Sequence, residues 1–317
     1  MTRTAAEMLI HVGYHKAAST VLQDQLFADP GGAFLPPPEP RHALVQRFVV
    51  PQPMCFDAAA ATRHYTPLLD RAAEQGRVPV LSHERFSGYP PSGGFDSTII
   101  ADRLHRCFPQ ARILIVVREQ RASILSMYSQ YVSDGGDLSL RDYLSPREPF
   151  LKRMPGFSEE FYRYHRLVQR YRALFGADRV LCLPFEEFAR SPGPTLQRIM
   201  GFVGRKAPPP VTRTQNAKRA ASFQLAQRQV NRWLSANELS PSRAVALGGF
   251  RRRFGALSGR LDPRWTAALD RRLERRMTAL VRARFAGRFA QSNSILSELI
   301  GFDLSQYGYQ TEDTVRD

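Results

Sequence analysis

The sequence lacks any long apolar run. Its longest unbroken aliphatic stretch, residues 113–117, is far too short to cross a bilayer. Residues 1–8 include an acidic side chain and no apolar stretch of signal-peptide length, so we expect no export and a cytoplasmic location. Cysteine is also rare. The three cysteines are odd in number and lack metal-ligand spacing, which favours reduced thiols over disulfides or a metal site.

Lysine is scarce, although the chain is strongly basic. Only four of the 45 basic residues are lysines, and one of them, Lys16, falls in the first loop. The segment from Arg205 to Arg288 holds 20 basic and four acidic residues, so it alone carries the net charge of +16. Such a block attracts nucleic acid, anionic lipid or an anionic substrate, and it can equally consist of solvated arginine-rich helix faces.

Short apolar segments alternate with helical patterns along the first two thirds of the chain. Strands are expected at 8–12, 78–81, 113–117 and 180–183. Helices are expected at 19–27, 58–75, 96–108, 122–132, 161–175 and 194–203. Residues 29–53 are rich in proline and glycine and are predicted to form a surface loop or lid. This alternation predicts an α/β fold with a parallel sheet covered by helices on its faces.

The chain beyond residue 204 has a mainly helical pattern. Apolar residues recur there at three- or four-residue spacing, which predicts a buried stripe on one helix: Trp265, Leu269, Leu273, Met277 and Leu280. We expect one domain over 1–317, with an α/β core at 1–204 and a basic, mainly helical extension at 205–317 packed on it.

The first predicted strand runs into an unusual loop. Gly13 is followed by Lys16, then by Ser19 and Thr20 at the start of a helix. A helix N-terminus presents free N–H groups and the positive end of its dipole, so this loop is a candidate anion site. Ligands of parallel sheets bind at the carboxyl ends of the strands, and Glu84 and Arg118 also follow predicted strands. Three candidate residues therefore share one edge of the sheet.

The loop differs from the phosphate loop of nucleotide triphosphatases. That loop has two glycines around four residues and then Lys-Ser/Thr. Here the lysine stands three residues before the serine, no glycine precedes the hydroxyls, and no later strand offers an acidic magnesium ligand. A nucleotide phosphotransferase is therefore the weaker enzyme alternative.

The loop resembles the 5′-phosphosulfate loop of sulfotransferases that use 3′-phosphoadenosine 5′-phosphosulfate, including bacterial sulfotransferase-domain proteins. The resemblance implies a P-loop-like three-layer fold. It also implies that Lys16 contacts the oxygen bridging phosphate and sulfate, and that Ser19, Thr20 and the amides of Ala17 and Ala18 hold the 5′-phosphate. Ala18 stands where the family usually has glycine. If that position needs a positive φ, alanine is strained there.

A second motif strengthens the resemblance. The family places an arginine at a strand end and a serine eight residues later, and Arg118 and Ser126 have that spacing. A guanidinium at the strand end and a hydroxyl about two turns into the following helix can both bind one 3′-phosphate. A later family loop covers the same phosphate, and the candidates here are Lys218 and Arg219.

Sulfuryl transfer needs a base for the acceptor. The family keeps its base at the end of the second predicted strand, where this chain has His83 and Glu84. Related bacterial sequences favour Glu84, whereas histidine has the better intrinsic pKa, so both stay candidates. His11 and His15 flank the first loop and are interpreted as structural or ligand-shaping, with His15 close enough in sequence to touch the co-substrate. No metal is implied.

The resemblance therefore implies a sulfotransferase that moves a sulfuryl group to a hydroxyl or amine of a glycan, lipid or small molecule. The basic segment would suit an anionic glycan or lipid, and peripheral membrane contact is open. The alternative without catalysis is a polyanion-binding protein that uses residues 205–290. The basic residues of that segment are not interleaved with stacking aromatics, so no nucleic acid is expected.

Overall fold

The computed structural model describes residues 7–29, 31–145, 157–206, 220–234 and 263–316. The chain divides into two compact units. The first, which we call the sheet unit, comprises residues 1–119, 158–214 and 287–317, and the second, the helical unit, comprises 120–157 and 215–286. Within the described residues, no helix is both long enough and apolar enough to cross a membrane. The organisation as one domain with a boundary at residue 204 stays a prediction.

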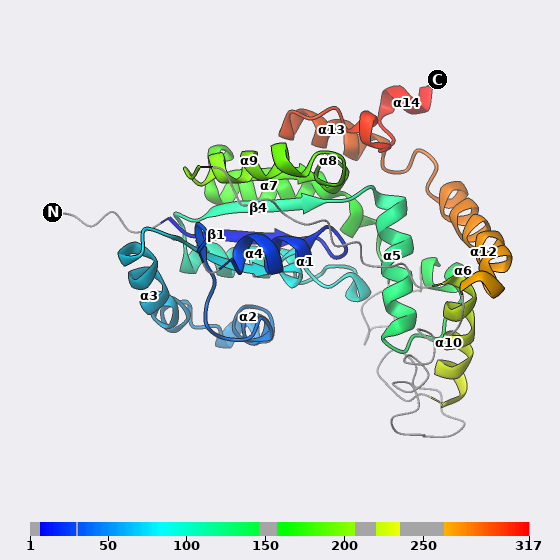
Figure 1. Cartoon of the computed structure of the whole chain (residues 1–317), viewed down its shortest axis with the longest axis horizontal. Helices are drawn as coiled ribbons and strands as arrows, with labels where there is room; N and C mark the ends of the chain where they lie inside the picture. Colours follow the sequence, from blue (N-terminus) through cyan, green and yellow to red (C-terminus); the bar gives the residue numbers. More distant parts are fainter. Residues whose placement is uncertain (1–6, 30, 146–156, 207–219, 235–262, 317) are drawn as a thin grey trace. The chain divides into compact units, whose positions relative to one another are not determined.

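The sheet unit is built on one parallel sheet (Figure 1). Its strands within the described residues are β1 (Leu9–Gly13), β2 (Phe34–Leu35), β3 (Val78–His83), β4 (Arg112–Val117) and β5 (Val180–Pro184). Their order is β2-β3-β1-β4-β5, and every pair is parallel. The central strand β1 is buried along its whole length, which explains its unbroken apolar pattern. The predicted α/β class with a central parallel sheet is confirmed.

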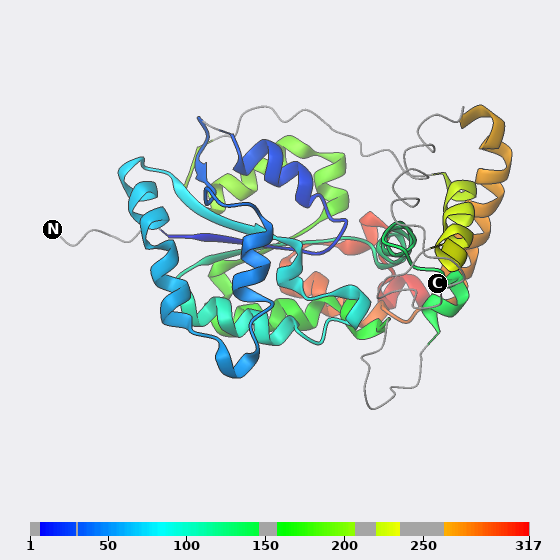
Figure 2. The same ribbon diagram turned by 90° about the horizontal axis from the view of Figure 1, so that it is seen from below.

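Helices cover both faces of this sheet. In Figure 2, α4 and α7 lie on one face, whereas α1, its continuation η1 and α9 lie on the other. The elements of the sheet unit other than strands and short 3-10 turns are α1 (Ser19–Val21), the π-helix η1 (Leu22–Phe27), α2 (His42–Phe48), α3 (Ala58–Glu74), α4 (Ser97–Cys107), α7 (Tyr164–Phe175), α8 (Phe185–Arg190), α9 (Pro192–Phe202), α13 (Ala290–Ile300) and α14 (Glu312–Arg316). The result is the expected three-layer arrangement.

The helical unit consists of α5 (Gln120–Ser133), α6 (Leu140–Leu144), α10 (Ala221–Leu234) and α12 (Pro263–Arg284) among its described residues. A buried amide ties α10 to the end of α5. Asn231 donates hydrogen bonds to the carbonyls of Val132 (2.7 Å) and Gly136 (2.9 Å), and it accepts one from Gln227 (3.0 Å). The described residues of the chain after 220 are largely helical, as expected, whereas the extent of a C-terminal extension over 205–317 stays a prediction.

Two sequence-based expectations are wrong. Residues 29–53 were expected to form a surface loop or lid with few regular elements, but part of this segment belongs to the core: Phe34 in β2 pairs beside Val78, and Phe48 in α2 is fully buried. The expected buried stripe on α12 is also incorrect: Leu269 is 50% exposed, and Leu273, Met277 and Leu280 are only half-buried. The buried contacts of this segment come instead from Val281 and Phe285. The side chain of Trp265 lies outside the described residues.

Candidate active site

The loop after β1 has a contorted backbone. Among the described residues other than glycine, only Lys16 (φ +65°) and Ala18 (φ +60°) have a positive φ. The Ala17 amide donates to the Tyr14 carbonyl (3.2 Å), which closes the turn, and Ala17 is fully buried. Lys16 is exposed, as is Thr20 in α1. This alternation directs the lysine outward at the carboxyl end of β1 while the loop stays anchored.

The left-handed backbone at Ala18 gives a prediction on stability. The left-handed conformation destabilises the folded state by about 1–2 kcal/mol for a residue other than glycine. Glycine removes this strain, but its greater freedom in the unfolded chain offsets part of the gain. We therefore expect Ala18→Gly to raise the free energy of unfolding by about 0.5–1 kcal/mol in urea denaturation. The matched control is Ala17→Gly, which is buried without a positive φ and should destabilise. Equal effects of the two changes would contradict the explanation.

Arg118 joins the end of β4 to this loop. Its Nη1 donates a hydrogen bond to the Lys16 carbonyl (3.0 Å), and the Tyr14 amide donates to the Val116 carbonyl (3.3 Å). The guanidinium also lies 5.1 Å from the centroid of the Phe185 ring. Within the described residues, Arg118 Nε is buried without a hydrogen-bond partner. The structure thus brings Lys16 and Arg118 together, as their strand-end positions predict.

Beneath the loop, Gly13 leaves room for a buried hydroxyl. A Cβ at Gly13 would lie 2.5 Å from Ser19 Oγ and 3.4 Å from His11 Nε2. Ser19 is 9% exposed, and neither of these two polar atoms has a hydrogen-bond partner among the described residues. Buried polar groups are usually paired, so a serine hydroxyl left open at a helix start is suited to receive a ligand oxygen.

Three histidines surround Glu84 at the junction of β1 and β3. His11 lies across from Ser82 in the sheet, and its Nδ1 is 2.7 Å from Ser82 Oγ. Burial lowers the pKa of His11 and of His15 to about 4 in each case. Both imidazoles are therefore neutral at pH 7.

His83 has a defined tautomer. Its Nδ1 accepts a hydrogen bond from the Arg85 amide (3.0 Å), so in the neutral ring the proton is on Nε2. Burial lowers the pKa of His83, which keeps the ring neutral at pH 7. Nδ1 is already engaged, and Nε2 carries a proton. The imidazole is therefore set up as a donor rather than as a base.

Glu84 is the anion of this cluster. Burial alone would raise the pKa of its carboxyl, but His83, the backbone at the start of the turn, His15 and His11 outweigh it and lower the pKa. The carboxylate is 3.7 Å from His83 Nδ1, and its side chain is 35% exposed. Glu84 is thus ionised at neutral pH and accessible from solvent.

Two residues that the sequence analysis did not place in the site hold it together. The hydroxyl of the fully buried Ser87 lies within hydrogen-bond distance of two carbonyls, those of Gly13 (3.1 Å) and Glu84 (2.9 Å), between which its one proton is shared. Glu186 accepts from the Glu119 amide (3.0 Å) and from the hydroxyl of the buried Tyr309 (3.0 Å). The first fixes the turn that carries Glu84 against β1, and the second fixes the chain directly after Arg118.

Three further residues were predicted to hold the 3′-phosphate: Ser126, Lys218 and Arg219. Ser126 lies half-buried in α5 of the helical unit, whereas Arg118 belongs to the sheet unit, so their convergence on one phosphate stays a prediction. Lys218 and Arg219 lie outside the described residues. In the part of the chain that the structure describes, no group of three potential metal ligands comes together.

A comparison with known protein families matches the middle part of the chain. Residues 97–209 match the model of the sulfotransferase family. This segment of the chain resembles sulfotransferases. The matched segment runs from α4 past β4 and β5 and contains Arg118, Ser126 and Glu186, while Lys16 and Glu84 precede it.

Solved sulfotransferase structures also resemble the chain. One from Alicyclobacillus acidocaldarius is 24% identical with a TM-score of 0.46, and the alignment covers 72% of this chain and 94% of that one. The sulfotransferase domain of the Synechococcus PCC 7002 olefin synthase is 19% identical (TM-score 0.37; 63% and 74% covered). A mouse sulfotransferase complexed with PAP is 13% identical (TM-score 0.35; 84% and 83% covered). No curated protein sequence matches the chain.

Proposed function

We propose that the protein is a sulfotransferase that moves a sulfuryl group from 3′-phosphoadenosine 5′-phosphosulfate to a hydroxyl or amine of its acceptor. The observation that supports the proposal is that three neighbouring strands end at the same edge of the sheet, each followed by a charged residue. Lys16 after β1, Glu84 after β3 and Arg118 after β4 lie on adjacent strands of one parallel sheet, at their carboxyl ends. A cation, a carboxylate and a guanidinium at that edge supply a leaving-group partner, a base and a phosphate ligand.

The donor would lie over the loop after β1. Ser19 and Thr20 hydroxyls and the amides at the start of α1 would hold the 5′-phosphate, with His15 at the edge of the site. The Ala17 amide is already bonded to Tyr14, so the contribution of this backbone would come from the neighbouring amides. Arg118 and Ser126 would hold the 3′-phosphate, and Lys218 and Arg219 would close over it.

The transfer step needs no metal in this proposal. The acceptor O–H gives its proton to the Glu84 carboxylate while the acceptor oxygen bonds to sulfur. The bond from sulfur to the bridging oxygen breaks in line, and the negative charge that develops on the leaving phosphate is stabilised by the Lys16 ammonium. Glu84 is the better base of the two candidates, because His83 presents a proton on Nε2 and has Nδ1 engaged.

The acceptor is a hydroxyl- or amine-bearing glycan, lipid or small molecule, and the basic segment would suit one that is already anionic. Binding at the donor site can be tested without knowing the identity of the acceptor. We expect calorimetry to show binding of adenosine 3′,5′-bisphosphate without magnesium, and Arg118→Ala to weaken that binding about 10–100-fold, as expected for a lost charge-assisted hydrogen bond.

The Arg118 variant also loses its bond to the Lys16 carbonyl, so its melting temperature has to be compared with that of the wild type. Arg112→Ala is the matched control, since Arg112 begins the same strand at the opposite end and pairs with Glu7 (2.6 Å). Magnesium-dependent ATP turnover without bisphosphate binding would overturn the proposal and favour a phosphotransferase.

A further inference from the structure

The outer side of α12 is a continuous basic surface. Arg271, Arg272, Arg275, Arg276 and Arg282 are all exposed, and we call these five residues the arginine face. At 100° per residue they fall within an arc of about 140° and span about 16 Å of helix. The acidic residues of α12 lie outside this arc, and Asp270 is engaged with the Ser222 amide (2.7 Å). Among the described residues, the arginine face makes no ion pair with a carboxylate.

The neighbouring helix α10 adds apolar side chains. Trp233 is 55% exposed and Leu225 is 40% exposed, and both lie on the same side of α10 at eight-residue spacing. The guanidinium of Arg232 is 5.6 Å from the Trp233 ring centroid. This helix contains no acidic residue. Its outer side therefore combines an aromatic ring, a leucine and a cation.

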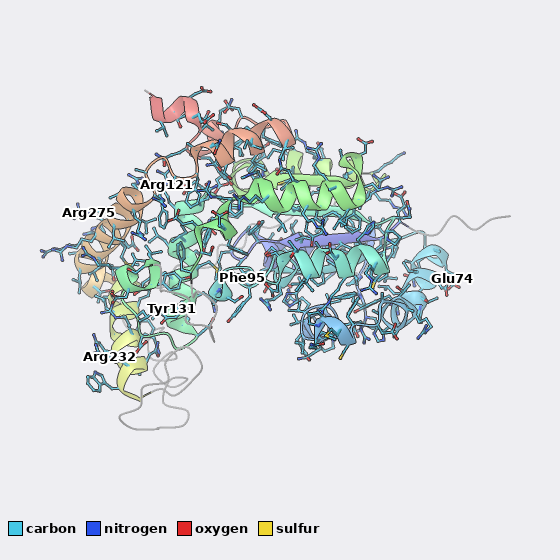
Figure 3. All side chains as sticks on the ribbon, turned by 180° about the vertical axis from the view of Figure 1, so that it is seen from behind. Glu74, Phe95, Arg121, Tyr131, Arg232 and Arg275 are labelled. Carbon is cyan, nitrogen blue, oxygen red and sulfur yellow. The ribbon has the colours of Figure 1, made fainter. Side chains whose placement is uncertain are left out.

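The two surfaces belong to one side of the helical unit. The helices α10 and α12 pack against each other and both pack against α5. Their buried side chains, Gln227 and Asn231 on α10 and Val281 on α12, lie on the inner side. Figure 3 shows Arg275 and Arg232 on the outer side of this group of helices. The exposed faces of both helices therefore point away from α5.

We propose that this side of the helical unit binds the surface of an anionic lipid bilayer. Basic clusters on amphipathic helices are attracted to anionic headgroups, and tryptophan and leucine enter the boundary between headgroups and acyl chains. Arginine forks pair with lipid phosphate and carboxylate oxygens. A soluble polyanion would account for the arginines alone, whereas a bilayer surface accounts for the exposed Trp233 and Leu225 as well. The proposal is independent of the proposed reaction.

Vesicle co-sedimentation of the full chain tests the proposal. We expect binding to phosphatidylcholine vesicles that contain about 30% phosphatidylserine, and little binding to phosphatidylcholine alone. Each basic residue near such a surface contributes about fivefold, so the triple change Arg271→Gln, Arg275→Gln and Arg282→Gln should weaken binding about 100-fold. The control removes the same charge from exposed arginines of the sheet unit: Arg63→Gln, Arg71→Gln and Arg205→Gln. Equal loss in both triple variants, or no preference for anionic vesicles, would overturn the proposal.

Tryptophan fluorescence separates a bilayer from a soluble polyanion. The chain has two tryptophans, so a Trp265→Phe background reports on Trp233 alone. We expect its emission to shift to shorter wavelength with anionic vesicles and to stay unchanged with heparin. Compared with the wild type, Trp233→Ala should bind anionic vesicles more weakly and heparin equally well. A blue shift with heparin, or vesicle binding unaffected by Trp233→Ala, would overturn the bilayer proposal in favour of a soluble polyanion.

Discussion

Replacing Lys16 by alanine is expected to lower kcat about 100- to 1,000-fold, the usual effect of removing one group that stabilises developing charge in a transition state. The bridging oxygen acquires its charge only as the bond to sulfur breaks, so binding of adenosine 3′,5′-bisphosphate should change far less than kcat. Release of labelled sulfate to an acceptor, measured beside calorimetry, gives both quantities.

The Lys16→Ala variant is well suited to the test because the substitution does not change the backbone strain at position 16. Lys16 has φ +65°, which alanine tolerates about as poorly as lysine, so the loop keeps the same preference. Lys206→Ala removes an exposed lysine of the same unit and serves as the control. Lys16→Arg should not restore activity, since a planar fork cannot replace a compact ammonium at one oxygen. If Lys16→Ala kept kcat within about fivefold, the assignment of the bridging contact would fall.

Several elements of the fold could be predicted because one physical signal dominates each of them. The strands β1, β3, β4 and β5 are apolar over most of their length, as strands covered on both faces must be. The strand β2 has only two residues, between Ala33 and Pro36, and Val78, the partner of Phe34 in β3, lies 44 residues further along the chain. No periodicity can emerge from two residues, so only tertiary pairing reveals that strand.

In the candidate site, too, some features could be predicted from local sequence and others depend on tertiary contacts. The positions of Lys16, Glu84 and Arg118 follow from strand ends, and the strain at Ala18 follows from an alanine at a position where the family has glycine. The bond from Arg118 to the Lys16 carbonyl spans 102 residues, and the one from Tyr309 to Glu186 spans 123. Contacts at such separations depend on how the whole sheet unit packs, so they cannot be predicted from local sequence patterns.

The tautomer of His83 changes the expected roles at the end of β3. From intrinsic pKa values alone, the histidine is the more suitable base. The Arg85 amide reverses that preference, because it occupies Nδ1 and leaves the neutral ring with its proton on Nε2. The lowered pKa of Glu84 keeps the carboxylate ready for a proton at neutral pH, at the expense of some basicity.

Glu84→Gln is therefore expected to lower kcat about 100- to 10,000-fold at pH 7, with little effect on binding of the bisphosphate. His83→Asn is the matched control, because the asparagine Oδ1 can still accept the hydrogen bond from the Arg85 amide. We expect that variant to keep kcat within about tenfold of the wild type.

The pH dependence follows from the direction of the Glu84 shift. A base must be unprotonated to act, and the pKa of Glu84 is lowered from its usual 4.5, so wild-type kcat/KM should hold on acidification until the pH is below 4.5. Stopped assays from pH 8 downward, over the range in which the fold survives by circular dichroism, measure this limb. If Glu84→Gln stayed active while His83→Asn lost most of its rate, His83 would be the base, and the hydrogen bond from Arg85 to Nδ1 would have to open before transfer.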